Sequence, residues 1–148
     1  MMDGIMIVRG LSAGLAATGA MTLVELPVRF RWGIEGLLDW QVNQRMASRI
    51  LKRPADALLL LGLGLHFLHG LVLGVVFVLV LPLFPSGPSL WVLGPGYGIA
   101  LFAVTLAIHR PATAGGPWSR ELGSVAVTTS FVTHLAYGTV LALLVVWP

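Results

Sequence analysis

Four apolar runs, each long enough to cross a lipid bilayer, dominate this chain of 148 residues. A membrane-spanning helix needs about 20 mostly apolar residues. Backbone groups in lipid must find their hydrogen bonds within the protein, so runs this apolar are expected to be helices. The expected spans cover residues 4–27, 57–84, 90–108 and 122–147. They predict an all-α membrane protein with a single transmembrane four-helix domain over residues 1–148.

The composition agrees with lipid as the surrounding solvent. Hydrophobic residues make up 57% of the chain and charged residues 10%, with a mean hydropathy of +0.91. A soluble domain carries about 25% charged residues. The chain has no cysteine, which excludes disulfides and thiolate metal sites. It has no phosphate loop, nucleophile elbow or HExxH motif either, so we expect no enzyme.

Basic residues gather in the connections after the first and third spans, whereas the connection after the second span has none. Cytoplasmic loops tend to carry the excess of Lys and Arg. We therefore expect both basic connections on the cytoplasmic side of a prokaryotic inner membrane, with both termini outside.

The first connection, residues 28–56, is too long to be a simple turn, and its residues 43–53 show the pattern of an amphipathic helix. Its basic side carries Arg45, Arg49, Lys52 and Arg53. This pattern favours a helix on the membrane surface that contacts anionic lipids, and it indicates no nucleic-acid partner. The alternative interpretation is a solvated connector that packs under the bundle.

The second half of the chain repeats features of the first half. An offset of 84 residues (98 − 14) places Gly14 on Gly98 in the odd spans. An offset of 68 residues (134 − 66) places His66 on His134 in the even spans, with Gly70 on Gly138. The matches predict two pseudo-repeated helix hairpins, related by an axis along the membrane normal.

Two histidines lie on the faces expected to point inward. Residues four apart share a helix face, and small residues at this spacing let helices approach closely. Such stripes contain His66 and His134, with His69 beside the first one. Both stripe histidines are expected near the bilayer midplane, where ionisable groups are rare and often functional. We expect no carboxylate at their depth.

One hypothesis for these histidines is a b-type haem. His66 and His134 would be the axial ligands of the haem iron, and Gly70 and Gly138 would leave room for the macrocycle. His69 is a further nitrogen ligand near the same face, which also keeps a zinc or copper site open as a less favoured alternative.

The alternative hypothesis is structural, and the residues favour it over haem. Each imidazole would form a hydrogen bond with a backbone carbonyl or with the side chain of Ser130, Thr133 or Tyr137. No cofactor would then be needed.

Glu25 and His109 form a second polar pair, because each precedes a proline by two residues near the cytoplasmic end of an odd span. If the repeat holds, the two side chains lie near each other. They could form a proton entry or a quinone headgroup site. The favoured interpretation is an interfacial ion pair or a solvated helix end.

Three short motifs carry a resemblance to a known family. They are GxxAGxxAT at residues 10–18, HFxxGxxxG at residues 66–74 and HxxYGxxL at residues 134–141. In these motifs the chain is similar to a family of small four-span prokaryotic membrane proteins of unknown function. The resemblance implies a compact helical membrane protein and no particular activity.

Three functions are consistent with these features. The favoured one is an accessory subunit of a larger membrane complex, which packs through its small-residue faces against other membrane subunits or further copies of itself. The second is a haem-bearing membrane anchor for electron transfer. The third is a small transporter or channel, against which we count the expected lack of a carboxylate at the midplane.

Overall fold

The fold is entirely helical over the residues that the computed structural model describes, which are 4–32, 39–84, 89–109 and 123–146. Four of its helices are long and apolar enough to cross a membrane, which confirms the predicted fold class of an all-α membrane protein. The α-helices are α1 (Gly4–Trp32), α2 (Asp39–Leu51), α3 (Leu59–Val80), α4 (Leu90–Val104) and α6 (Gly123–Val146), and α2 is the one among them that is not a candidate span.

Three short segments extend these helices. A 3-10 turn, η1 (Asp56–Leu58), leads into α3, and a second one, η2 (Leu81–Leu83), follows it. A π-helix, η3 (Thr105–His109), continues α4. With these extensions the apolar spans run over Gly4–Val28, Asp56–Leu83, Leu90–Ile108 and Val125–Val145.

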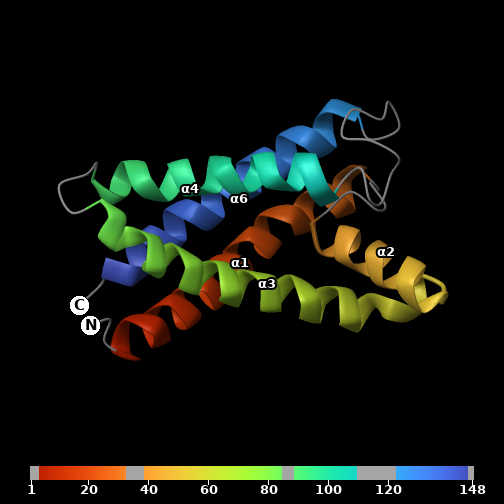
Figure 1. The fold of residues 1–148 in the computed structure, drawn as a ribbon. Helices are drawn as coiled ribbons and strands as arrows, with labels where there is room; N and C mark the ends of the chain where they lie inside the picture. The colour runs from red at the N-terminus through yellow and green to blue at the C-terminus, as the bar shows by residue number, and fades with distance from the viewer. Residues whose placement is uncertain (1–3, 33–38, 85–88, 110–122, 147–148) are drawn as a thin grey trace.

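The four spans form two hairpin-like pairs that are joined through the first and last helices. Helix α1 packs on α3, α4 packs on α6, and α1 also packs on α6. The N-terminal end of α1 and the C-terminal end of α6 lie at the same end of the bundle, and α2 lies at the opposite end (Figure 1). The protein is therefore a multi-pass membrane protein, while the inner membrane and the outward-facing termini stay predictions.

Glycines bring the backbones of each pair into contact. A Cβ atom added to Gly10 would lie 2.9 Å from the carbonyl oxygen of Gly74, and one added to Gly138 would lie 2.8 Å from the backbone nitrogen of Gly98. The first contact joins α1 to α3 and the second joins α6 to α4. Because small residues allow this approach, the predicted stripes are helix-packing faces.

These contacts recur at the two predicted offsets. Gly14 of α1 lies against Gly70 of α3, and their counterparts Gly98 of α4 and Gly138 of α6 also lie against each other. Around these contacts the buried core contains Ala13, Ala17, Met21, Phe77, Val78, Tyr137, Leu141, Ala142 and Val145.

Helix α2 is the predicted helix of the first connection, but it begins at Asp39, four residues before the expected start at residue 43. Its first half, residues 39–44, is buried, and it packs on α3. A Cβ at Gly62 would lie 2.6 Å from the Cβ of Gln44, so this glycine admits α2 against α3. The first half of α2 therefore lies inside the protein and not on its surface.

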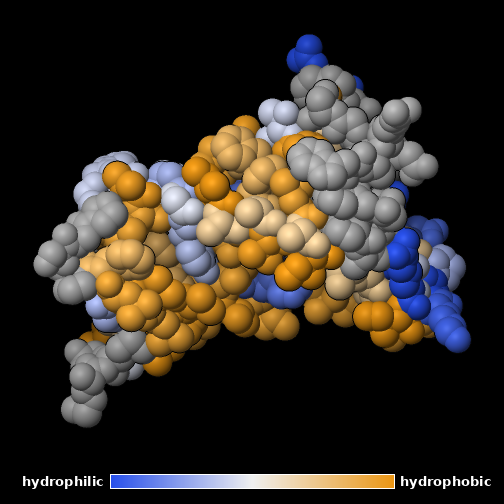
Figure 2. Space-filling view, turned by 45° about the horizontal axis from the view of Figure 1, so that its top comes forward, coloured by the Kyte–Doolittle hydropathy of each residue, from blue (hydrophilic) through white to orange (hydrophobic). Residues whose placement is uncertain are grey.

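The second half of α2 has the predicted exposed character. Arg49, Lys52 and Arg53 are exposed, and Arg45 is partly exposed. The helix ends in a Schellman-type turn, because Lys52 has a left-handed φ of 52° and the amide of Arg53 donates to the carbonyl of Ser48 at 3.2 Å. In Figure 2, hydrophilic residues gather at this end of the molecule, while hydrophobic residues cover the long helices.

Candidate functional site

A polar cluster forms where the start of α2 meets the middle of α6. The hydroxyl of Ser130 in α6 donates a hydrogen bond to Oδ1 of Asp39 at 3.3 Å. Oγ1 of Thr133 lies 3.4 Å from Oδ2 of Asp39 and 3.0 Å from the carbonyl oxygen of Ser130, which is the closer acceptor for its one hydroxyl proton. His134 Nδ1 lies 3.6 Å from Asp39 Oδ2. All four residues are buried. The name Asp39 cluster is used below for Asp39, Ser130, Thr133, His134 and Thr105, whose contact with His134 is described below.

The depth of this cluster follows from the position of His134 in its span. At 1.5 Å per residue, His134 lies about 14 Å from Val125 and about 17 Å from Val145. Its contact Asp39 therefore lies within the apolar layer, at the level of the middle of α6, whereas Glu25 and Thr105 lie three residues from the ends of their spans at Val28 and Ile108. The expectation that no carboxylate lies at the depth of the histidines was wrong, because it treated the first connection as a surface element.

Glu25 holds the start of α2 in place. Its Oε1 accepts a hydrogen bond from the backbone amide of Asp39 at 3.2 Å, and its side chain is only 1% exposed. The first amides of a helix have no partner within the helix, and the helix dipole favours a negative group there. Glu25 of α1 thus positions Asp39 through the backbone.

The predicted pairing of Glu25 with His109 is not tested, because the side chain of His109 lies outside the described residues. The backbone places His109 at the end of η3. Glu25 is a buried contact of α2, whereas the sequence analysis favoured a solvated or interfacial position for it.

Two hydrogen bonds determine the tautomer of His134. Its Nδ1 lies 2.6 Å from the carbonyl oxygen of Ser130, which can only accept, so Nδ1 carries the proton. Its Nε2 lies 3.0 Å from the hydroxyl of Thr105 and therefore accepts from it in the neutral ring. Thr105 is the first residue of the π-helix η3, and such turns often re-aim side chains at functional sites.

His66 has the opposite tautomer. Thr22 of α1 donates its hydroxyl proton to the carbonyl of Thr18 at 2.8 Å, so it can only accept from His66 Nε2, which lies 3.2 Å away. Nε2 of His66 therefore carries the proton, and its Nδ1 is the acceptor nitrogen. The structural hypothesis predicted a backbone carbonyl or the side chain of Ser130, Thr133 or Tyr137 as the partner. His134 contacts the carbonyl of Ser130 in its own helix, whereas the cross-helix partners of the two histidines are Thr22 and Thr105.

A cavity of about 230 Å³ brings most of the predicted residues together. His66, His69, Gly70 and His134 all line it, as does Asp39. Gly138 is not part of this lining and contacts α4 instead. The lining of the cavity thus combines a carboxyl group, imidazoles and the Thr105 hydroxyl.

The residues present do not fit a haem between the two histidines. Both Nε2 atoms are engaged by threonine hydroxyls. Neighbouring helices occupy the space beside the two glycines that were expected to make room for the macrocycle. A Cβ at Gly70 would lie 2.9 Å from the Cβ of Thr18, and Gly138 contacts α4. Haem thus remains a hypothesis from the sequence, without support from this geometry.

A metal ion has no ready site in the described part of the chain, where no group of three or more His, Cys, Asp or Glu side chains could hold one. The imidazoles and Asp39 instead form hydrogen bonds with hydroxyls and carbonyls. The chemistry this arrangement offers is hydrogen bonding and proton exchange with a polar group that enters the cavity.

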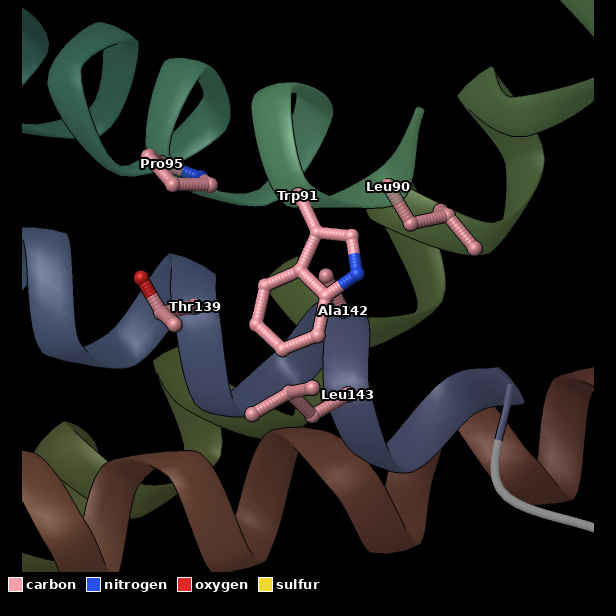
Figure 3. A pocket seen from close by; sticks show the side chains of 6 residues that line it. All are labelled: Leu90, Trp91, Pro95, Thr139, Ala142 and Leu143. Atoms are coloured by element: carbon pink, nitrogen blue, oxygen red, sulfur yellow. The ribbon is translucent and has the colours of Figure 1, made fainter. Parts of the chain in front are cut away.

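A second cavity, of about 220 Å³, lies between α4 and α6 and is mainly apolar (Figure 3). Trp91 of α4, which is 70% exposed, projects towards Ala142 and Leu143 of α6. The hydroxyl of Thr139 in this lining already donates to the carbonyl of Leu135 at 2.8 Å. We interpret this cavity as a lipid-facing groove and place the candidate site at the Asp39 cluster.

Asp39 and Thr105 are the residues that sequence reasoning missed. Asp39 and Asn43 are four apart and so share a helix face, and both line the cavity. The apolar Trp40 and Val42 between them argue against a solvated connector, and this signal was readable in the sequence. The role of Thr105 had no such signal, because it depends on the π-helix.

Comparison of the chain with known protein families, with curated proteins and with solved structures finds no match. The resemblance to small four-span prokaryotic membrane proteins therefore continues to rest on the three short motifs alone.

Proposed function

We propose that this protein is a small integral membrane protein that binds a compact hydrogen-bonding ligand at the Asp39 cluster. The observation that supports this most directly is the position of Asp39, whose carboxyl group reaches the hydroxyls of Ser130 and Thr133 and the imidazole of His134 inside the bundle. A purely structural subunit has no need of a carboxyl group at this depth.

An energy comparison supports a functional role for Asp39. An aspartate at the centre of a membrane helix costs about 2.5–3.5 kcal/mol on insertion scales. Hydrogen bonds between membrane helices contribute on average about 0.6 and at most about 1.7 kcal/mol each. The hydroxyl bond from Ser130 and the contact with Thr133 therefore offset the cost at best. A fully apolar packing at this position would be about as stable, so net stability does not account for this residue.

The position of Asp39 also changes how strongly each of the three functions considered from the sequence is supported. The expected lack of a carboxylate near the histidines counted against a transporter, and Asp39, which lies beside His134, weakens that argument. A role as subunit of a larger membrane complex concerns the outer surface and is compatible with an interior binding site. That role stays a proposal, which co-purification in mild detergent followed by mass spectrometry tests.

Native mass spectrometry of the protein released from its own membrane tests the proposed function. We expect a small-molecule adduct on the wild type, and we expect Asp39→Asn to lose it, because the amide keeps the shape but replaces an acceptor oxygen with a donor. Asp56→Asn is the matched control, because Asp56 is exposed at the start of η1. A wild type without any adduct, or an equal adduct on Asp39→Asn, would contradict the proposal.

A further inference from the structure

The cavity at the Asp39 cluster opens sideways, between α3 and α4. Among its lining residues, Val72 of α3 is 52% exposed and Val104 of α4 is 51% exposed, whereas Asp39, His66 and His134 are buried. The exposed part of the lining therefore lies on these two helices, where His69 of α3 is also exposed, and Asp39, His66 and His134 lie behind it.

The packing of the helices explains this opening. The closely packed pairs are α1 with α3, α4 with α6, α1 with α6 and α2 with α3, and the pair α3 with α4 is not among them. These two helices meet through Tyr97, which donates to the carbonyl of Leu73 at 2.8 Å and whose ring lies 5.1 Å from that of Phe77. Beyond this contact, towards α2, the cavity separates them.

The opening faces lipid and not water. Val72 and Val104 both lie within apolar spans. At 1.5 Å per residue they lie roughly 17 Å and 21 Å from the ends of those spans at Leu83 and Leu90, inside a hydrocarbon core of about 30 Å. In Figure 2, a hydrophilic patch shows between hydrophobic surfaces in the middle of the visible face.

The size of the cavity limits what fits inside. At about 230 Å³ it is smaller than the pockets of about 300–1,000 Å³ that enclose drug-sized ligands. A compact head group fits, and any longer part of the ligand must extend through the opening into the bilayer.

We propose that the ligand is a single-chain amphiphile that enters from the bilayer between α3 and α4, with a neutral head group at the Asp39 cluster and an apolar tail in lipid. This inference rests on the proposed function and adds the ligand class and its route. The head group both donates and accepts hydrogen bonds, because the carboxyl group of Asp39 and Nδ1 of His66 accept, and the amide of Asn43 can donate. It is neutral, because a charged head group is costly at this depth.

Photolabelling in lipid nanodiscs tests the proposal. The probe is hexadecan-1-ol with a diazirine in its chain, and decan-1-ol and decane are the competitors. We expect the probe to label the segments around Val72 and Val104, and we expect decan-1-ol but not decane to compete. Loss of the head-group bonds in Asp39→Asn should reduce labelling by about tenfold.

Tryptophan substitutions test the route. Val104→Trp and, separately, Val72→Trp fill the opening and should reduce labelling by a similar factor of about ten. Val132→Trp is the matched control and should label like the wild type, because Val132 is 45% exposed on α6 and is not part of the cavity lining. Each variant is first shown to be helical and monodisperse.

The outcomes separate this inference from the proposed function. Equal labelling of the wild type and both blocked variants, or equal competition by decane, overturns the amphiphile and its route. If the Asp39-dependent adduct of the native protein is present but the alcohol probe does not label the opening, the proposed function stands and this inference fails. If Asp39→Asn changes neither adduct nor labelling, both fail.

Discussion

The two helix pairs of this protein use the same packing device and differ in their chemistry. In α1–α3 and in α4–α6, glycines bring the backbones together, and a histidine on the second helix contacts a threonine on the first. Among the described residues, Asp39 of α2 brings a carboxyl group to His134 of the second pair, whereas Glu25 of the first pair binds the backbone of α2. The features that the two pairs share determine how the helices pack, and the features in which they differ form the candidate site.

The two equivalent histidines show what this difference does. His66 donates to Thr22 through Nε2, whereas His134 donates to a carbonyl through Nδ1 and accepts from Thr105 through Nε2. Identical side chains at repeated positions therefore present opposite tautomers. The environment supplied by α2 and by the π-helix η3 makes them chemically different.

The largest effects are expected where the two pairs are alike. Gly74→Ala and Gly138→Ala should each destabilise the protein by about 3 kcal/mol, because the new methyl group meets backbone atoms that cannot move away easily. Unfolding in mixed micelles, followed by circular dichroism, measures this free energy. Gly64→Ala, in the same helix as Gly74, and Gly96→Ala, in α4 opposite Gly138, are the controls, because nothing lies within 4 Å of a Cβ at either position. A cost at only one of the two contacts would show that the repeat is not structural.

A smaller effect is expected where the pairs differ. Asp39→Ala should destabilise the protein by roughly 1–2 kcal/mol, because the buried hydroxyl of Ser130 loses its acceptor while Thr133 and His134 keep the carbonyl of Ser130. The exposed Asp56→Ala should stay within about 0.5 kcal/mol of the wild type. Equal unfolding energies for the two variants would mean that Asp39 does not join α2 to α6.

The threonine partners allow a direct test of the opposite tautomers. Thr22→Val and Thr105→Val should each cost about 1 kcal/mol, the size of one hydrogen bond between membrane helices. Nitrogen NMR of the imidazoles should show two different changes. In Thr22→Val the protonated Nε2 of His66 loses its hydrogen-bond acceptor, and in Thr105→Val the unprotonated Nε2 of His134 loses its hydrogen-bond donor. Spectra that show the same protonated nitrogen in both histidines would contradict the proposed chemical difference between the two helix pairs.

The smallest effect concerns the exposed end of α2, which has no described counterpart in the second pair. Lys52→Gln and Arg53→Gln should each weaken retention of anionic lipid by about 1 kcal/mol or less, because each removes one charge near the headgroups. Lipid retention in native mass spectrometry measures this. Arg9→Gln on α1 is the control, and an equal loss there would mean that α2 holds no particular lipid.

The fold was predictable from the sequence because lipid leaves few alternatives. Apolar runs of this length form helices, and small residues four apart mark the faces that pack. Gly14, Gly70, Gly98 and Gly138 are all at such contacts. The helix in the first connection was also predicted, although its buried start was not.

The site was predictable only in part. His66 and His134 were identified as inward-facing residues, and both line the cavity. Asp39 was missed, because amphipathicity was read for residues 43–53 and the helix begins earlier. Thr105 was missed for a different reason: a π-turn shifts which side of α4 faces α6, and no residue pattern in the span announces it.

The contact between Asp39 and α6 has a consequence for how the protein is made. Asp39 and Ser130 are 91 positions apart, so at a synthesis rate of about 5–20 residues per second the ribosome needs roughly 5–18 s between them. During that interval the nascent chain holds a carboxyl group whose hydroxyl partners do not yet exist. Helix α6 is thus the element that completes the interior, and a chain truncated before it would expose this defect to membrane proteases.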